Sequence, residues 1–91
     1  MKRKFKTGRE IMTRGVADWC DDETYFKVLA CLVRHIEGDW GEVCKEDWAS
    51  NDAALKNGDR LLSAYTVNGK LIWIITEWDR SATTILFPDE Y

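Results

Sequence analysis

We predict an α+β fold for this chain of 91 residues, and three observations support that prediction. Residues 21–38 carry apolar side chains at helical spacing, residues 60–87 alternate with a period of two around Asn68-Gly69, and hydrophobic residues make up 45% of the sequence. The first pattern is typical of an amphipathic helix and the second of strands joined by a tight turn. We therefore expect one domain, residues 1–91, which opens with a basic segment, residues 1–9.

The elements are expected in the order β-α-α-β-β-β. A first strand is predicted near residues 9–14, between Gly8 and Gly15. The next element is a helix, because five apolar residues form one stripe at spacings i, i+3, i+4, i+7 and i+11: Tyr25, Val28, Leu29, Leu32 and Ile36. Asp21 or Asp22 can cap its first N–H groups, and Gly38 can adopt the left-handed conformation that ends it.

Residues 44–58 predict a second helix with Glu46 and Asp47 in its first turn. Its apolar stripe is thin because Asn51 and Asp52 occupy the middle, so we expect this helix at the edge of the domain. Three period-two runs follow, RLLSAYTV, KLIWIITEW and ATTILF, joined by NG and by DRS. They predict a three-stranded meander, and hence an antiparallel sheet with two helices packed on one face.

The central run, KLIWIITEW, is apolar on both faces. The helices cover one face, and the other needs a cover from the N-terminal strand, the second helix or a second subunit. A homodimer is therefore among our expectations.

The charge of the chain is unevenly distributed. Residues 1–9 hold five cations and no acid, so residues 10–91 hold 8 cations against 16 acids, a balance of −8. An acidic body favours partners with a basic surface. The longest apolar runs are far shorter than the roughly 20 residues of a membrane helix, and three cysteines are an odd number, so we expect a cytoplasmic protein with reduced thiols and no membrane partner.

Candidates for chemistry at a metal or an active site are few. Cys31 and His35 share a helical face, and Cys20 and Cys44 could join them as ligands, but the sequence contains no closely spaced ligand pair. We therefore expect no metal and no cofactor. An enzyme would use His35 with Asp39 or Glu37, Ser63 or Ser81 as the nucleophile, and Arg80; because no catalytic motif accompanies these residues, we expect a non-enzymatic protein.

Nucleic-acid binding through the basic segment is a further alternative, since five tryptophans could stack on bases. Four of them have acids beside them, in ADWCDDE, GDWGE, EDWAS and TEWDR, and these carboxylates would repel phosphates. The same pairing suits a protein surface, where Trp is an anchor and the acids attract Lys or Arg. Asp79-Arg80-Ser81 fits an ordinary turn, in which Arg80 could still point outward and recognise a partner.

Three stretches carry a resemblance to a known group of proteins: RHIEGDWGEVCKEDWASNDAAL, GDRLLSAY and IWIITEWDRSATTILFPDEY. Over residues 11–91 the chain resembles short uncharacterised bacterial proteins of plasmids, conjugative elements and phages. The resemblance implies a mobile-element setting, where small acidic proteins often counter restriction or CRISPR systems.

We accordingly expect an interaction protein that binds and inhibits or modulates a nucleic-acid-handling host complex, as an anti-CRISPR or anti-restriction factor would. The expected partner is a protein with a basic surface rather than nucleic acid itself. The candidate partner-binding residues are the acids and tryptophans of the connector and second helix, together with one arginine: Glu37, Asp39, Trp40, Glu42, Glu46, Asp47, Trp48, Asp52 and Arg80.

Overall fold

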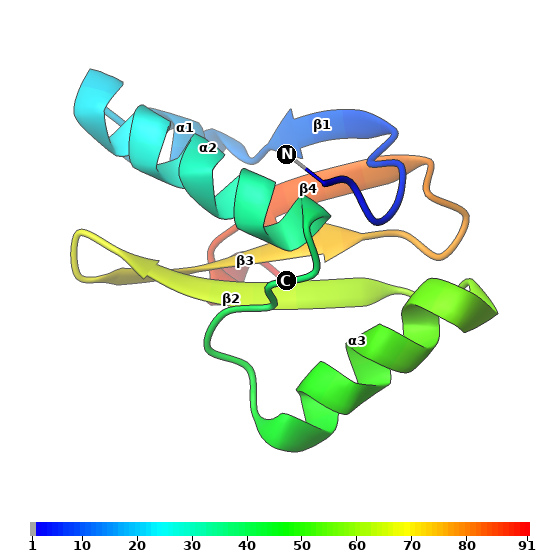
Figure 1. The fold of residues 1–91 in the computed structure, drawn as a ribbon. Helices are drawn as coiled ribbons and strands as arrows, with labels where there is room; N and C mark the ends of the chain where they lie inside the picture. The colour runs from blue at the N-terminus through cyan, green and yellow to red at the C-terminus, as the bar shows by residue number, and fades with distance from the viewer. Residues whose placement is uncertain (1) are drawn as a thin grey trace.

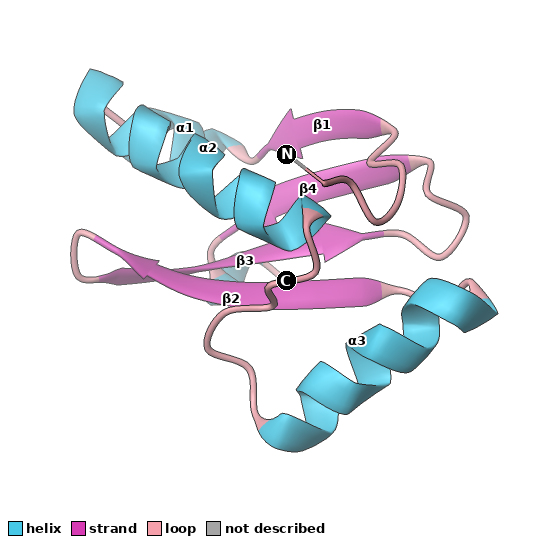
Figure 2. Cartoon of the chain, in the orientation of Figure 1, coloured by secondary structure: helices cyan, strands magenta, loops and turns pink. Residues whose placement is uncertain are grey.

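The computed structural model describes residues 2–91 and confirms the α+β class (Figure 1). Four strands form one sheet, and three helices pack around it (Figure 2). In chain order the elements are β1 (Arg9–Met12), α1 (Arg14–Trp19), α2 (Asp22–Ile36), α3 (Lys45–Asn57), β2 (Leu61–Val67), β3 (Lys70–Thr76), β4 (Ala82–Leu86) and a 3-10 turn, η1 (Pro88–Glu90).

The sheet has the strand order β1-β4-β3-β2 and is mixed. The meander β2-β3-β4 is antiparallel as predicted, but β1 pairs with β4 in the parallel direction, so the expectation of a fully antiparallel sheet was wrong. Tight turns force successive strands to run in opposite directions, whereas β1 is separated from the meander by all three helices. Its direction therefore depends on long-range packing, for which the local sequence has no signal.

Helix α2 has the boundaries that its residues predict. The Asp21 side chain accepts a hydrogen bond from the Thr24 N–H at 2.8 Å, and Gly38 follows the helix with a φ of 84°. Of the expected apolar stripe, Val28 is fully buried whereas Tyr25 is 44% exposed. Helix α1 was not predicted, because six residues are too few to display an apolar period.

Two hydrophobic clusters hold the fold together. The larger joins α1 and α2 to one face of the sheet, with Val16, Val28, Ile74 and Ile85 among its members. The smaller contains Trp40, Ala54 and Leu61, with Phe5 packed against it. Helix α3 thus lies beside β2, at the lower side of the view in Figure 1. The two helices that pack on the same face of the sheet are α2 and α1, whereas we had expected α2 and α3.

The C-terminal turn packs on the sheet as well. The ring of Tyr91 meets Trp73 of β3 edge-on at 5.9 Å, and η1 contacts β3. The Glu90 carboxylate accepts hydrogen bonds from the Thr13 hydroxyl and the Phe87 N–H, both at 2.8 Å. Residues 88–91 therefore pack on β3, for which we had expected contacts from the N-terminal strand, the second helix or a second subunit.

Candidate functional site

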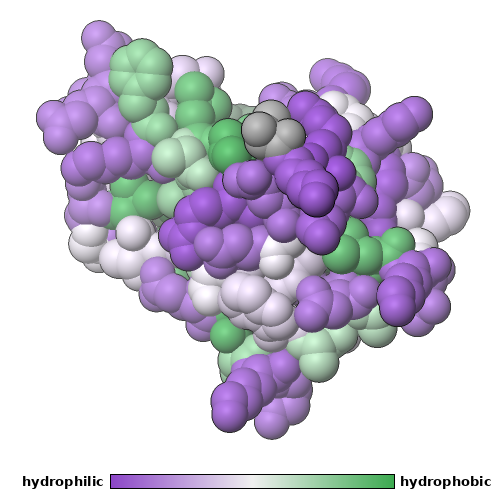
Figure 3. Space-filling view, viewed as in Figure 1, coloured by the Kyte–Doolittle hydropathy of each residue, from purple (hydrophilic) through white to green (hydrophobic). Residues whose placement is uncertain are grey.

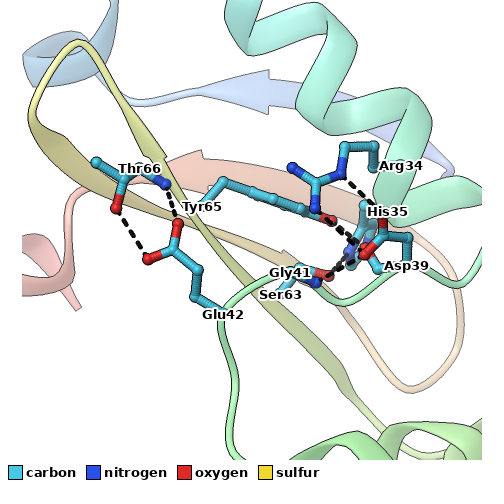
Figure 4. A network of polar contacts seen from close by, with 8 residues as sticks. All are labelled: Arg34, His35, Asp39, Gly41, Glu42, Ser63, Tyr65 and Thr66. Atoms are coloured by element: carbon cyan, nitrogen blue, oxygen red, sulfur yellow. Dashed lines mark hydrogen bonds and ion pairs between the residues drawn. The ribbon is translucent and has the colours of Figure 1, made fainter.

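His35 of α2 is fully buried and lies in the middle of a chain of hydrogen bonds across the sheet, of which Figure 4 includes the His35 and Ser63 side chains. Its Nδ1 contacts the Ser63 Oγ on β2, and its Nε2 lies 2.8 Å from the Thr76 Oγ1 on β3. The Thr76 Oγ1 lies 2.7 Å from the Thr83 Oγ1 on β4, and the Thr83 hydroxyl donates to the Thr7 carbonyl at 2.8 Å. The network thus links all three meander strands, α2 and the N-terminal segment.

Donor and acceptor counting gives this network one direction. Thr83 uses its only proton on a carbonyl, so its oxygen accepts the Thr76 proton. The Thr76 oxygen must then accept from the His35 Nε2–H, and the unprotonated Nδ1 accepts from the Ser63 hydroxyl. The network fits a neutral imidazole, because a second ring proton would face a hydroxyl that already points toward the ring.

Electrostatics favour the same neutral state. Burial, and after it the positive charge of Arg80, lower the pKa of His35 from 6.5 to about 3. Ser63 is as deeply buried as His35, so neither side chain is accessible to a substrate. The arrangement stabilises the fold, and it gives no support to an active site built on His35, Asp39 and Arg80.

The connector between α2 and α3 is organised by Asp39 (Figure 4). Its carboxylate pairs with the Arg34 guanidinium at 2.8 Å and accepts from the Gly41 N–H at 3.1 Å. These contacts, the Arg34 hydrogen bond first, hold the pKa of Asp39 below its usual range despite partial burial. The Asp39 carbonyl accepts from the Tyr65 hydroxyl at 2.6 Å, and burial raises the pKa of that hydroxyl. The connector is thereby tied to both α2 and β2.

This connector and α3 together close the outer edge of β2. The Asn51 amide donates to the Leu62 carbonyl at 2.8 Å and accepts from the Leu62 N–H at 3.2 Å. Two residues further along β2, the Ala64 N–H donates to the Trp40 carbonyl and the Ala64 carbonyl accepts from the Glu42 N–H. These contacts replace a neighbouring strand, so this edge does not offer its backbone to another chain.

The Glu42 carboxylate occupies the next backbone group on this edge of β2, that of Thr66. It accepts from the Thr66 N–H at 2.6 Å and from the Thr66 hydroxyl at 2.9 Å (Figure 4). Close approach of the connector to β2 requires Gly41, whose φ is 73° and where a Cβ would lie 2.1 Å from the Ala64 carbonyl oxygen. Glu42 is therefore exposed but already engaged within the chain.

Trp40 and Arg80 are structural residues, contrary to our expectation of a partner contact. Trp40 is 0% exposed, and its Nε1 donates to Asp52 at 3.0 Å. Arg80 has a left-handed φ of 59°, and its guanidinium donates to the carbonyls of Asp59, Glu77 and Ala54 at 2.6, 3.1 and 3.0 Å. The Trp40 side chain therefore lies in the core rather than on the surface, and the Arg80 guanidinium is already engaged within the chain.

The remaining candidate residues are three acids and Trp48, and they differ in whether they already contact the rest of the chain. Glu37 accepts from the Lys2 backbone N–H at 3.2 Å, and Trp48 is half-buried against the smaller cluster. Glu46 and Asp47 are exposed in the first turn of α3, and neither forms an ion pair among residues 2–91. A hollow of about 240 Å³ beside them is lined by Asp47, Ser50, Asn51, Arg60 and Leu62.

The role of Asn51 at the edge of β2 was not among our predictions. Its position was a usable signal, because it falls on the stripe of Cys44, Trp48 and Leu55 and is buried in the structure. A polar side chain on a core-facing stripe needs a hydrogen-bond partner, which here is the edge of β2. The contribution of Thr7 to the His35 network had no comparable signal, since it depends on which strands become neighbours.

Among residues 2–91, His, Cys, Asp and Glu side chains form no group of three that could hold a metal ion. None of the helices in this part of the chain has both the length and the apolar character needed to cross a membrane. No protein-family model matches the chain, and no curated protein or solved structure matches it.

Proposed function

We propose that the protein is a non-enzymatic interaction protein that presents an acidic surface, built from the α2–α3 connector and the first turn of α3, to a basic surface of a nucleic-acid-handling complex. The resemblance to plasmid and phage proteins favours inhibition of a host restriction or CRISPR complex as the outcome. Binding would place carboxylates where that complex normally holds phosphates.

One observation carries this proposal: the connector and α3 contain an excess of acid that the fold does not neutralise. Residues 37–52 hold six acids and one cation, a balance of −5. Among residues 2–91, Asp39 is the only one of these six acids that forms an ion pair. Unpaired carboxylates on a rigid surface attract Lys and Arg and accelerate encounter with a basic partner.

The structure narrows the test to two residues. Glu42 and Asp52 hold the connector and Trp40 in place, so changing them would disturb the fold. Glu46 and Asp47 are exposed, and reversing both to Lys changes the local charge by four units. We expect E46K/D47K to lose capture of the partner complex from a bacterial lysate and to lose protection of a challenged phage or plasmid in cells.

The chain provides a matched control. Asp22 and Glu23 are also exposed acids in the first turn of a helix, so D22K/E23K makes the same charge change with a similar helix-dipole penalty on a different surface. D22K/E23K also removes the Glu23–Lys27 ion pair, which contributes little to stability because it is exposed to solvent. Equal loss in both double variants would assign the effect to net charge. Capture that survives E46K/D47K, or captured proteins without a role in handling nucleic acids, would refute the proposal.

Direct nucleic-acid binding is a second candidate, because the N-terminal cations are held on a fixed surface. The Lys4 N–H donates to the Ile36 carbonyl at 2.9 Å, and Phe5 stacks on Trp40 at 6.2 Å, while the five cations of residues 2–9 are exposed. This candidate predicts DNA or RNA affinity that falls steeply with salt and disappears when Lys2, Arg3 and Lys6 become Gln. Affinity that is insensitive to those changes would exclude it.

A further inference from the structure

The two edges of the sheet differ in a way that the proposed function does not use. The outer edge of β2 is closed by Asn51, Trp40 and Glu42, as described above. At the other edge, β1 pairs with β4 alone. The N–H groups of Arg9 and Thr13 point to β4, where they donate to Ser81 and Ile85. By the alternation of a parallel ladder, the backbone groups of Glu10 and Met12 point outward.

Apolar surface gathers along this open edge. Four of the seven large hydrophobic side chains that are exposed in the described residues belong to β1 and α2: Ile11, Tyr25, Phe26 and Val33. A groove of about 200 Å³ runs between the two elements and is lined by Glu10, Ile11, Met12, Tyr25, Leu29, Leu32 and Ile85. Figure 3 shows apolar surface in the upper left, over the region that α2 occupies in Figure 1. An open edge beside such a groove is a site for an added strand.

The charges at the two ends of β1 indicate which strand fits. Residues 2–9, at its start, hold five cations and no acid, whereas residues 13–23, at its end, hold four acids and one cation. In an antiparallel pair of identical strands, the basic start of each copy lies against the acidic end of the other. The edge is therefore electrostatically complementary to itself, which is the requirement for a twofold interface.

We propose that two copies of this chain pair through β1 in antiparallel fashion, which joins their sheets into one of eight strands. The twofold axis passes beside Ile11, so that Glu10 of each copy exchanges backbone hydrogen bonds with Met12 of the other. This register brings the two exposed Ile11 side chains together and places Met12 of the second copy next to the groove. A register shifted toward the N-terminus would pair Glu10 with itself, which like charge disfavours.

The shift in the opposite direction is excluded by the fold. It would pair Glu10 with Arg14, but Arg14 is the first residue of α1 and Thr13 caps that helix, so the strand has ended there. One register therefore satisfies both the backbone and the charges. This dimer does not rest on the proposed function, since the acidic surface lies on the connector and α3.

The test measures mass and register separately. By light scattering after gel filtration at high micromolar concentration, the wild-type chain should have the mass of two 10.6 kDa chains. I11K places two ammonium groups at the axis and should halve that mass, while L71K, at a similarly exposed position on β3, should leave it unchanged. A wild-type chain that is monomeric under these conditions, or an I11K variant that remains dimeric, overturns the proposal.

Cysteine cross-linking tests the register without depending on how well I11K folds. In a background where Cys20 and Cys44 are Ser, I11C should form a disulfide-linked dimer under mild oxidation, because facing residues of a non-hydrogen-bonded pair lie about 4.5 Å apart at Cα. In R9C the two cysteines would be offset by four residues, about 13 Å, and should not link. Cross-linking through R9C and not I11C would refute this register.

Discussion

Replacing His35 should remove a pH dependence of stability that no other histidine can supply. His35 is the only histidine of the chain, and its pKa falls from 6.5 to about 3 on folding. The folded state therefore holds His35 neutral while the unfolded state takes up a proton, so stability is intact above pH 6.5 and decreases as pH falls toward 3. Between pH 7 and pH 5 the linkage relation gives a loss of about 2 kcal/mol in the free energy of unfolding.

Urea unfolding followed by tryptophan fluorescence at half-unit steps from pH 7.5 to pH 5 measures this slope. H35Q keeps a polar side chain near Ser63 and Thr76 and should be less stable at pH 7 but nearly independent of pH in this window. The carboxylates with lowered pKa, such as Asp39, lose their contribution only at lower pH. A flat wild-type profile, an equal slope in H35Q, or an NMR titration of the imidazole near pH 6.5 in the folded protein would refute the reasoning.

Three further predictions concern the closed edge of β2 and the hydrogen bonds of Arg80. N51L should lower the free energy of unfolding by about 2–3 kcal/mol, because it leaves the Leu62 N–H and C=O unpaired, and chemical unfolding measures this loss. The open strand edge should also promote aggregation, which light scattering detects. G41A should lose at least twice as much free energy of unfolding as G58A. Both glycines have positive φ, which strains Ala by about 1–2 kcal/mol, but of the two only Gly41 faces a backbone oxygen. Equal losses in the two variants would contradict this. R80K should cost about 2 kcal/mol in thermal unfolding, since an ammonium group cannot span three carbonyls, and an unchanged melting temperature would contradict that role.

Local patterns were sufficient for the elements whose contacts lie close in the sequence. The stripe and caps of α2 and the Asn68-Gly69 hairpin are set by spacings of a few residues, and the structure confirms both. Helix α1 has too few residues to display a period, so only its Thr13 cap distinguishes it from a loop. The parallel direction of β1 depends on contacts with β4, and each paired residue there lies 73 positions further along the chain.

The same difference between local patterns and long-range contacts applies to the candidate partner-binding surface. That the connector and α3 are acidic follows from the sequence alone, because charge is a property of composition. Which of these residues face solvent depends on tertiary contacts: Trp40 is buried, Asp52 and Glu42 accept hydrogen bonds within the chain, and Arg80 donates to carbonyls. A side chain becomes a structural or a surface residue according to the backbone groups that folding brings beside it, and those neighbours come from distant parts of the chain.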